Sequence, residues 1–342
     1  TENNEIITLS EGTKIKTQTT FIESEVLLER DLSASSWTNH DLLTNGVDLM
    51  ANAKVNSNAK TLSESFLGTV AFVNQGAEFV ADNGIREAVR RANMDSLTAF
   101  GAIQGGSSHY QTGSYIDVDG TGLVLGATSK VNEKVWAGFF EVGWADSTSH
   151  VLGTRAEADH DYYGLGIALH YSITSSVYTQ ASLRAGLTKT KFKGSFAQEG
   201  VSYDSDSLYA SAHLTMGLLL PIGQDLFSDW YLRYTFSYTD ADSVTMTDSL
   251  MSRLDMDSTK THALRAGTRL EGECFENMNW RFGLAYEHTF DGKAQGYINT
   301  LALEVPSLEG DTIITELGMT LKTANSPWNI DIGAKGYLGD RQ

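Results

Sequence analysis

The sequence predicts an all-β fold class, a transmembrane antiparallel up-and-down β-barrel with a helix in its lumen. About eleven segments of roughly 9–14 residues between Leu97 and Leu338 carry an apolar side chain at every second position. The loops that join these segments alternate between long and short. No window holds eighteen uninterrupted apolar residues, so the sequence contains no transmembrane helix. These observations favour membrane-spanning strands.

The composition suits long strands and excludes several classes of protein. Only 3 of the 342 residues are proline, which cannot donate to a strand ladder, and 32 are glycine, which allows curved strands. The single cysteine, Cys274, excludes an intrachain disulfide and a multi-cysteine metal site. A net charge of -18 argues against nucleic-acid binding. The mean hydropathy of -0.22 fits a barrel because an apolar and a polar face are averaged.

Residues 1–60 carry the weakest pattern. Thr13–Phe21 alternates like a strand, and Phe21–Leu28 contains an apolar patch. The chain opens on Thr1 without a start methionine or a signal peptide, so we expect a processed piece or a fragment. We interpret this region as the tail of a larger upstream domain.

Residues 61–95 are predicted to form a helix. The apolar side chains follow helical spacing, and Ser63 is a suitable N-cap. Gly68, Gly76 and Gly84 lower helix propensity but make the helix thin, which suits passage through a narrow pore. An amphipathic helix packed outside a sheet is the alternative.

Residues 96–342 are predicted to form the barrel, with one face of each strand apolar and rich in large aromatic side chains. In Trp230–Thr239, for example, Trp230, Leu232 and Tyr234 share one face and Arg233 lies on the other. Charges of both signs on the inner face can pair with one another or with a polar plug. The lumen-facing polar candidates are Glu141, Arg184, Arg233, Arg265, Arg269, Arg281, Glu287 and Glu316, and His170, Asp331 and Lys335 share this face.

The loops predict an orientation. Outer-membrane barrels place short turns in the periplasm and long loops outside. The predicted long loops are 106–120, 146–161, 193–207, 240–260 and 291–310. The predicted short turns are 129–133, 172–176, 221–228, 272–279 and 323–327. The odd-numbered strands should therefore run outward.

Tryptophans support this orientation. Trp136, Trp230, Trp280 and Trp328 each lie at the start of an odd-numbered strand, so we expect them on one periplasmic rim. Tryptophan gathers at membrane interfaces because its ring is apolar and its N–H hydrogen-bonds with water. The alternative is that these side chains cap the core of a β-sandwich.

No catalytic or metal-binding motif stands out. The group His150, Asp159, His160 and Asp161 could serve a surface hydrolase, although charged loop residues are the simpler interpretation. The sequence contains no G-x-S-x-G elbow, and Asp117–Gly120 lacks the glutamate of a calcium loop. We therefore expect no enzyme activity, cofactor or metal.

Four stretches, in their order and spacing, resemble the C-terminal translocator domain of a type V autotransporter. They are Leu62–Ala81, Ala99–Ala127, Trp280–Ala294 and Ile330–Arg341. The resemblance implies a twelve-stranded outer-membrane barrel that threads a helix and holds an exported passenger at the cell surface. It makes residues 1–60 a passenger or linker remnant. The implied partners are outer-membrane lipid, the barrel-assembly machinery, periplasmic chaperones and the upstream passenger, with the barrel a monomer.

Two further expectations concern the closing strand of the barrel and cleavage of the passenger. Its last strand ends in an aromatic residue, whereas Gln342 follows the eleventh segment, so we expect the closing strand to be absent and no heat-modifiable band in SDS. Some autotransporters cut their own passenger inside the barrel, for which Asn74, Asn83 and Asn93 with Glu141 or Glu287 are the candidates. A channel without a passenger, a surface hydrolase and a soluble adhesin remain alternatives.

Overall fold

The computed structural model describes residues 57–342 apart from 95, 197–198, 224, 249–250, 276, 300 and 323–328, together with the backbone of three earlier strands. Those strands are β1 (Lys14–Gln18), β2 (Ile22–Arg30) and β3 (Val47–Val55), which form an antiparallel sheet in that order. The first two coincide with the strand pattern and apolar patch predicted between residues 13 and 28.

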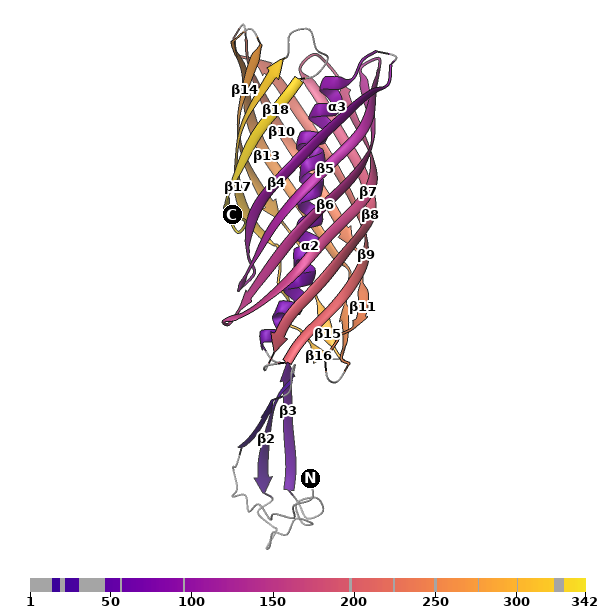
Figure 1. Ribbon diagram of the computed structural model, residues 1–342. Coiled ribbons are helices and arrows are strands. Elements are labelled where there is room, and N and C mark those ends of the chain that lie inside the picture. Colours follow the sequence, from indigo (N-terminus) through magenta and orange to yellow (C-terminus); the bar gives the residue numbers. More distant parts are fainter. Residues whose placement is uncertain are drawn as a thin grey trace.

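The main sheet has eleven strands, each antiparallel to its neighbour in the chain, and it curls into an up-and-down barrel (Figure 1). Its strands in chain order are β4 (Thr98–Gln111), β5 (Tyr115–Val131), β6 (Lys134–Val151), β7 (Thr154–Ser172), β8 (Val177–Phe196), β9 (Glu199–Pro221), β10 (Leu226–Thr239), β13 (Thr259–Phe275), β14 (Met278–Thr289), β17 (Gly310–Lys322) and β18 (Asn329–Gly339). The predicted fold class is confirmed.

A helical segment runs along the inside of the barrel (Figure 1). It consists of a 3-10 turn η1 (Ser57–Ala59), α2 (Lys60–Phe79), a π-helical turn η2 (Val80–Gly84) and α3 (Ile85–Arg91). Buried residues occur all round α2, which the barrel wall surrounds, so the alternative of a helix outside the sheet is wrong. None of the helices in the described ranges combines the length and the hydropathy needed to cross a bilayer.

The predicted N-cap at Ser63 is wrong. The helix begins at Lys60 because η1 leads directly into it, and its N-cap Ala59 makes no side-chain cap. Ser63 Oγ instead lies 2.9 Å from the carbonyl oxygen of Lys60 and 2.8 Å from that of Glu304. The hydroxyl therefore joins the helix to the loop that carries Glu304.

Glycine allows two close approaches between helix and wall. A Cβ on Gly76 would lie 2.8 Å from Tyr162 Oη and 2.9 Å from Arg184 Nη1, and one on Gly68 would lie 3.0 Å from His160 Nε2. Gly84 has no neighbour closer than 3.9 Å, so only the first two predicted glycines need their small size.

A small sheet lies at the end of the barrel where α2 begins. It contains β11 (Asp242–Thr245), β12 (Arg253–Met256), β15 (Gly296–Ile298) and β16 (Leu301–Ala302). The four short strands lie in the two connections β10–β13 and β14–β17. Met246, Leu254 and Ile298 from these two loops form one apolar core with Leu62 and Phe66 of the helix. The loops therefore cover the helix where it enters the barrel.

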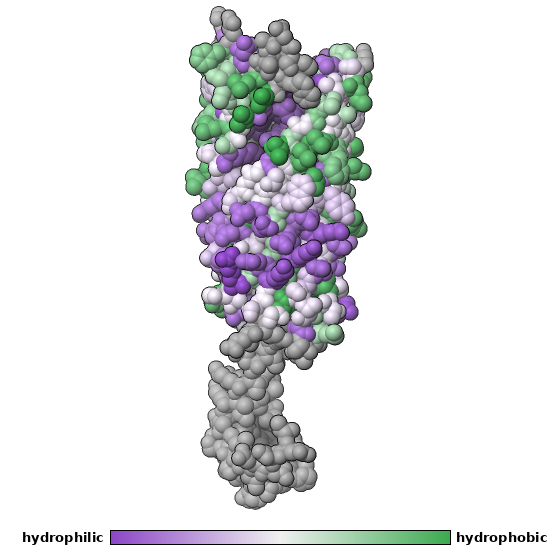
Figure 2. Space-filling model, viewed as in Figure 1, coloured by the Kyte–Doolittle hydropathy of each residue, from purple (hydrophilic) through white to green (hydrophobic). Residues whose placement is uncertain are grey.

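The outer surface carries an apolar belt. Alternate residues such as Leu165, Leu232 and Leu317 expose 50–69% of their surface. Figure 2 shows hydrophobic surface toward the end of the barrel that contains α3 and a hydrophilic band nearer the end where α2 begins. The belt is the surface that a bilayer requires of a barrel wall.

Three predicted long loops are wrong. Residues 106–120, 146–161 and 193–207 are mostly strand, because backbone pairing continues beyond the apolar belt whatever the polarity of the side chains. The other two contain β11–β12 and β15–β16. Four predicted short turns are confirmed as connections of a few residues, and 323–327 lies outside the described residues.

Tryptophans occur at both edges of the belt. Trp136 and Trp230 point outward and are 49% and 55% exposed, and Trp280 shares the outward face of β14 with Phe282. Trp328 lies outside the described residues. Trp144 is 51% exposed at the opposite edge, beside the outward-facing Asp146. Aromatic residues at both interfaces are typical of membrane barrels.

The two outermost strands of the main sheet meet at one end only. β4 and β18 run in the same direction, and Gly339, with φ +132°, turns the chain back. Residues 340–342 then pair antiparallel with β4, with His109 N donating to Gln342 O at 2.6 Å and Gln111 N donating to Asp340 O at 3.0 Å.

Candidate functional site

The candidate site is a cluster of buried charges between the helix and the inner wall. On the helix it begins with an i, i+4 series of two acids followed by two bases, Glu78, Asp82, Arg86 and Arg90. In an α-helix such a series drifts by about 40° per step around the axis. The wider π-helical turn at 80–84 reverses part of that drift and keeps the four residues near one face.

Asp82 is the most highly connected member of this lumenal charge cluster. Its Oδ1 lies 2.7 Å from Arg269 Nη2 and 2.8 Å from Arg233 Nη2. Its Oδ2 lies 3.3 Å from Arg265 Nη1 and also contacts Lys335 Nζ. The carboxylate is only 1% exposed, so four wall cations surround a buried anion.

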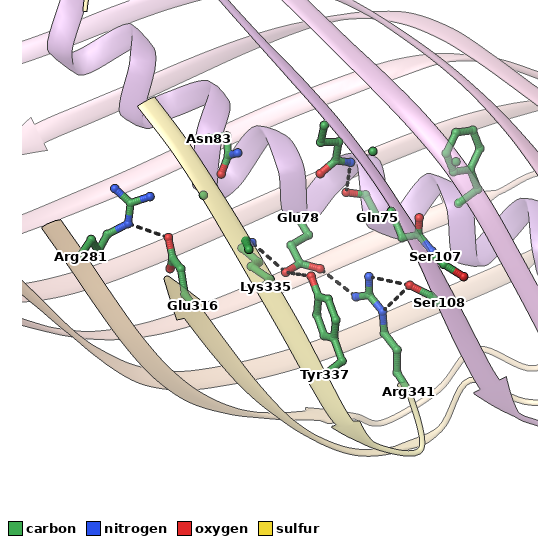
Figure 3. A pocket seen from close by; sticks show the side chains of 17 residues that line it. Gln75, Glu78, Asn83, Ser107, Ser108, Arg281, Glu316, Lys335, Tyr337 and Arg341 are labelled. Atoms are coloured by element: carbon green, nitrogen blue, oxygen red, sulfur yellow. Dashed lines mark hydrogen bonds and ion pairs between the residues drawn. The ribbon is translucent and has the colours of Figure 1, made fainter. Parts of the chain in front are cut away.

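Glu78 lies one helical turn earlier and faces the strand that ends the sheet (Figure 3). Lys335 Nζ and Tyr337 Oη of β18 each lie 3.0 Å from its Oε1, and Arg341 Nη1 lies 2.8 Å from its Oε2. Arg341 is also 3.4 Å from Ser108 of β4. This glutamate therefore connects the helix to both edges of the main sheet.

The two helix bases face wall acids. Arg86 Nη2 lies 3.1 Å from Glu316 Oε1, and Arg90 pairs with Asp331. Arg281 bridges those two acids, at 2.7 Å from Glu316 Oε1 and 3.3 Å from Asp331 Oδ2. The wall therefore presents cations to the helix acids and acids to the helix bases.

A second buried group lies nearer the middle of α2. Arg184 Nε is 2.7 Å from Glu141 Oε1, to which Tyr209 Oη donates at 2.6 Å. Arg184 Nη1 donates to the backbone oxygen of Val73 at 2.9 Å. The wall thus binds the helix backbone directly beside Gly76, where a larger residue would clash.

All eight sequence-predicted lumenal residues lie on the inner face. Seven are buried, and Glu287, which is 16% exposed, pairs with Arg265 Nη2 at 2.8 Å. Arg184 and Glu141 form the second group, and the remaining predicted residues join the cluster around Asp82 and Glu316. Sequence reasoning missed the helix partners Glu78, Asp82, Arg86 and Arg90, although their four-residue spacing was a readable signal.

The predicted hydrolase group is not assembled. Strand alternation buries His160 in the lumen, where Ser147 Oγ lies 2.7 Å from its Nε2, while Asp159 and Asp161 point outward. His150 faces Asp117 on the neighbouring strand at 3.6 Å. Within the described ranges, no group of three histidine, cysteine or acidic side chains is arranged to hold a metal ion.

Two of the three candidate self-cleavage asparagines form hydrogen bonds elsewhere. Asn74 donates to Thr261 at 3.3 Å and Asn93 donates to Thr98 at 3.3 Å. Asn83 and Glu78 line a cavity of about 320 Å³. No hydrogen bond within the described part of the chain joins Glu141 or Glu287 to any of the three asparagines.

The comparisons with known proteins agree with this architecture. The family model described as autotransporter beta-domain matches residues 99–335. The fold is similar to the translocator domain of NalP from Neisseria meningitidis, with TM-score 0.60 and 17% identity over 78% of this chain and 94% of that one. It is also similar to the transport unit of AIDA-I from Escherichia coli, with TM-score 0.60 and 12% identity over 83% and 93%.

A third similar structure is the beta domain of BrkA from Bordetella, with TM-score 0.55 and 14% identity over 72% of this chain and 94% of that one. A search of curated proteins finds no matching relative. The matched family is a transport and anchoring unit of the bacterial outer membrane, with the passenger on the cell surface, and it is not an enzyme family. The family match covers more than half of the sequence, and the chain therefore belongs to the autotransporter β-domain family.

Proposed function

We propose that the lumenal charge cluster holds the helix at one fixed position in the translocator barrel, and so anchors the exported passenger. The supporting observation is the complementarity of the series Glu78, Asp82, Arg86 and Arg90 with the wall. Its acids face Arg233, Arg265, Arg269, Lys335 and Arg341, and its bases face Glu316 and Asp331. Buried pairs of this kind specify position, because a misplaced helix leaves charges buried without partners.

Reversing the helix series tests this proposal. The variant E78R/D82R/R86E/R90E keeps the net charge of the helix. The matched control is R155E/E157R, which reverses an outer ion pair of 3.0 Å whose residues are 62% and 65% exposed. Proteinase K digestion of the folded barrel in detergent should leave a fragment that starts near residue 57 in the wild type and the control.

In the reversed variant the helix should be digested, so the fragment should start near residue 98. Barrel folding is checked separately by circular dichroism, which reports strand content. Equal fragments from the reversed variant and the wild type would contradict the proposed role of the charges.

We infer that residues 1–60 belong to the passenger or its linker, that 61–95 provide the threading helix and that 96–342 provide the barrel. The support is that β3 leads through η1 into α2 at the loop-covered end of the barrel. Short turns at the α3 end are periplasmic in this assignment. The barrel acts as a monomer, and its assembly uses the outer-membrane assembly machinery and periplasmic chaperones.

We also propose that one further strand fits between β4 and β18. These two edges run in the same direction, so they cannot form an antiparallel pair, whereas residues 340–342 run back along β4. Unpaired strand edges in lipid are costly. The 342-residue chain should run at one position in SDS whether heated or not, and a version extended by an amphipathic strand should become heat-modifiable. A heat-modifiable band from the 342-residue chain would contradict this inference.

A further inference from the structure

The outer wall contains a groove above β13. Its floor is formed by two small outward-facing residues, Ala266 and Thr268. Strand register places Leu232 and Tyr286 on either side of Ala266, and Trp230 and Leu284 on either side of Thr268. The resulting cavity has a volume of about 930 Å³.

The groove lies within the apolar belt. Leu232, Leu284 and Tyr286 are 48–50% exposed, and Trp230 is 55% exposed, so both sides are high and apolar. Met216 and Ile313, which are 57% and 47% exposed, continue these sides on β9 and β17. The groove is therefore an indentation of the lipid-facing surface and is continuous with it.

A polar group lies just beyond one end of the groove, past the outward-facing Leu264. Toward the cell-surface end, Tyr234 Oη of β10 lies 2.5 Å from Nδ1 of His262 on β13. On the other side of β13, Tyr286 Oη donates to Asp311 Oδ1 at 2.6 Å, and His288 Nδ1 also lies 2.6 Å from that oxygen. At the opposite end of the floor, Trp230 lies beside Thr268. The groove is thus apolar along its length, and the polar group lies beyond it on the outer-leaflet side, reached through Tyr286.

We propose that this groove binds one acyl chain of an outer-leaflet lipid, with the lipid headgroup beside Asp311, His288 and His262. An acyl chain is linear, flexible and already present along this surface. Its polar headgroup would lie beside the polar group just beyond the groove. A second barrel is a poor occupant. Two convex walls touch at their protruding side chains, so the side chains of a second barrel would not reach Ala266 and Thr268 between the side chains of β10 and β14. The proposal is independent of how the helix is held.

Filling the groove tests the proposal. Ala266→Phe places a large side chain on the floor. Ala185→Phe is the matched control, because Ala185 also faces outward in the belt, between Leu165 and Ala210. Both proteins are reconstituted in dimyristoylphosphatidylcholine vesicles that contain a phospholipid spin-labelled near the end of its acyl chain. Electron paramagnetic resonance then counts the motionally restricted chains per barrel.

The wild type and Ala185→Phe should restrict the same number of chains, and Ala266→Phe should restrict about one fewer. If Ala266→Phe does not fold, Thr268→Leu serves as a smaller filling substitution with the same expected result. Asp311→Asn should shorten the residence of the lipid without changing the number of restricted chains. An equal number of restricted chains in the filling variant and the control would overturn the proposal. So would a wild-type dimer in detergent that Ala266→Phe converts to monomer, because a second barrel would then occupy the groove.

Discussion

Replacing Asp82 by asparagine isolates the contribution of the charges to helix docking. Four cations contact this carboxylate, but three of them have other acidic partners. Arg265 pairs with Glu78 and Glu287, Lys335 pairs with Glu78, and Arg269 pairs with Glu316. Asp82 is the only carboxylate within ion-pair distance of Arg233 in the described part of the chain.

The substitution therefore leaves one buried cation, Arg233, without a charged partner. Removing one partner of a buried ion pair typically costs about 3–5 kcal/mol. With an m-value of about 2 kcal/mol per molar urea, the midpoint of unfolding should fall by roughly 2 M. The measurement is urea unfolding of the refolded barrel in detergent micelles, followed by tryptophan fluorescence.

Asp255→Asn is the control, because Asp255 lies 2.7 Å from Arg253 but the two side chains are 35% and 65% exposed. Its midpoint should match the wild type, since solvent screens exposed pairs. Adding Arg233→Gln to Asp82→Asn should recover part of the loss, because the orphaned charge is removed. The reasoning fails if Asp82→Asn behaves like Asp255→Asn, or if the two lumenal substitutions are simply additive.

Three further substitutions test the contacts of the helix. Phe72→Ala should lower the free energy of unfolding by about 3–5 kcal/mol, because Phe72 fills the space above Gly120 and Gly143, and a urea midpoint near that of the wild type would contradict this. Gly76→Val should make the helix sensitive to proteinase K, because its Cβ would meet Arg184, and a protected helix would show that the wall can yield. Burial raises the pKa of Glu64, so wild-type stability should fall as pH rises from about 4.5 through that raised value. Glu64→Gln should show no such fall. The measurement is the urea midpoint of each protein at pH 4 and at pH 8, and the midpoint should drop between the two pH values more in the wild type than in Glu64→Gln.

The inner and outer faces of the strands could be predicted because side chains alternate with a period of two. Arg233 and Trp230 fall on opposite faces whatever the barrel radius or strand tilt, so local sequence is sufficient. The ends of the strands could not be predicted in the same way. Beyond the belt the outer face of β6–β9 meets water and its residues become charged. The outward apolar pattern therefore stops before the hydrogen-bonded ladder does.

The small sheet and the helix partners were missed for different reasons. β15 and β16 have only three and two residues, too few for any periodicity to register. The partners of Asp82 lie on β10, β13 and β18, which are 150 or more residues away in sequence. Which wall residue meets which helix residue depends on how far the helix extends into the barrel, and no local pattern encodes that distance.

The order of charges on the helix explains why one position is favoured over its neighbours. A shift of the helix by one turn is about 5.4 Å, close to the four-residue spacing of the series. Shifting it one way would bring Arg86 to the place of Asp82, among Arg233, Arg265 and Arg269. Shifting it the other way would bring Asp82 to the place of Arg86, beside Glu316. Each slip buries like charges together. A series with four charges of the same sign would tolerate a one-turn slip, because each position would receive the same charge. The change of sign between Asp82 and Arg86 therefore opposes a slip in either direction.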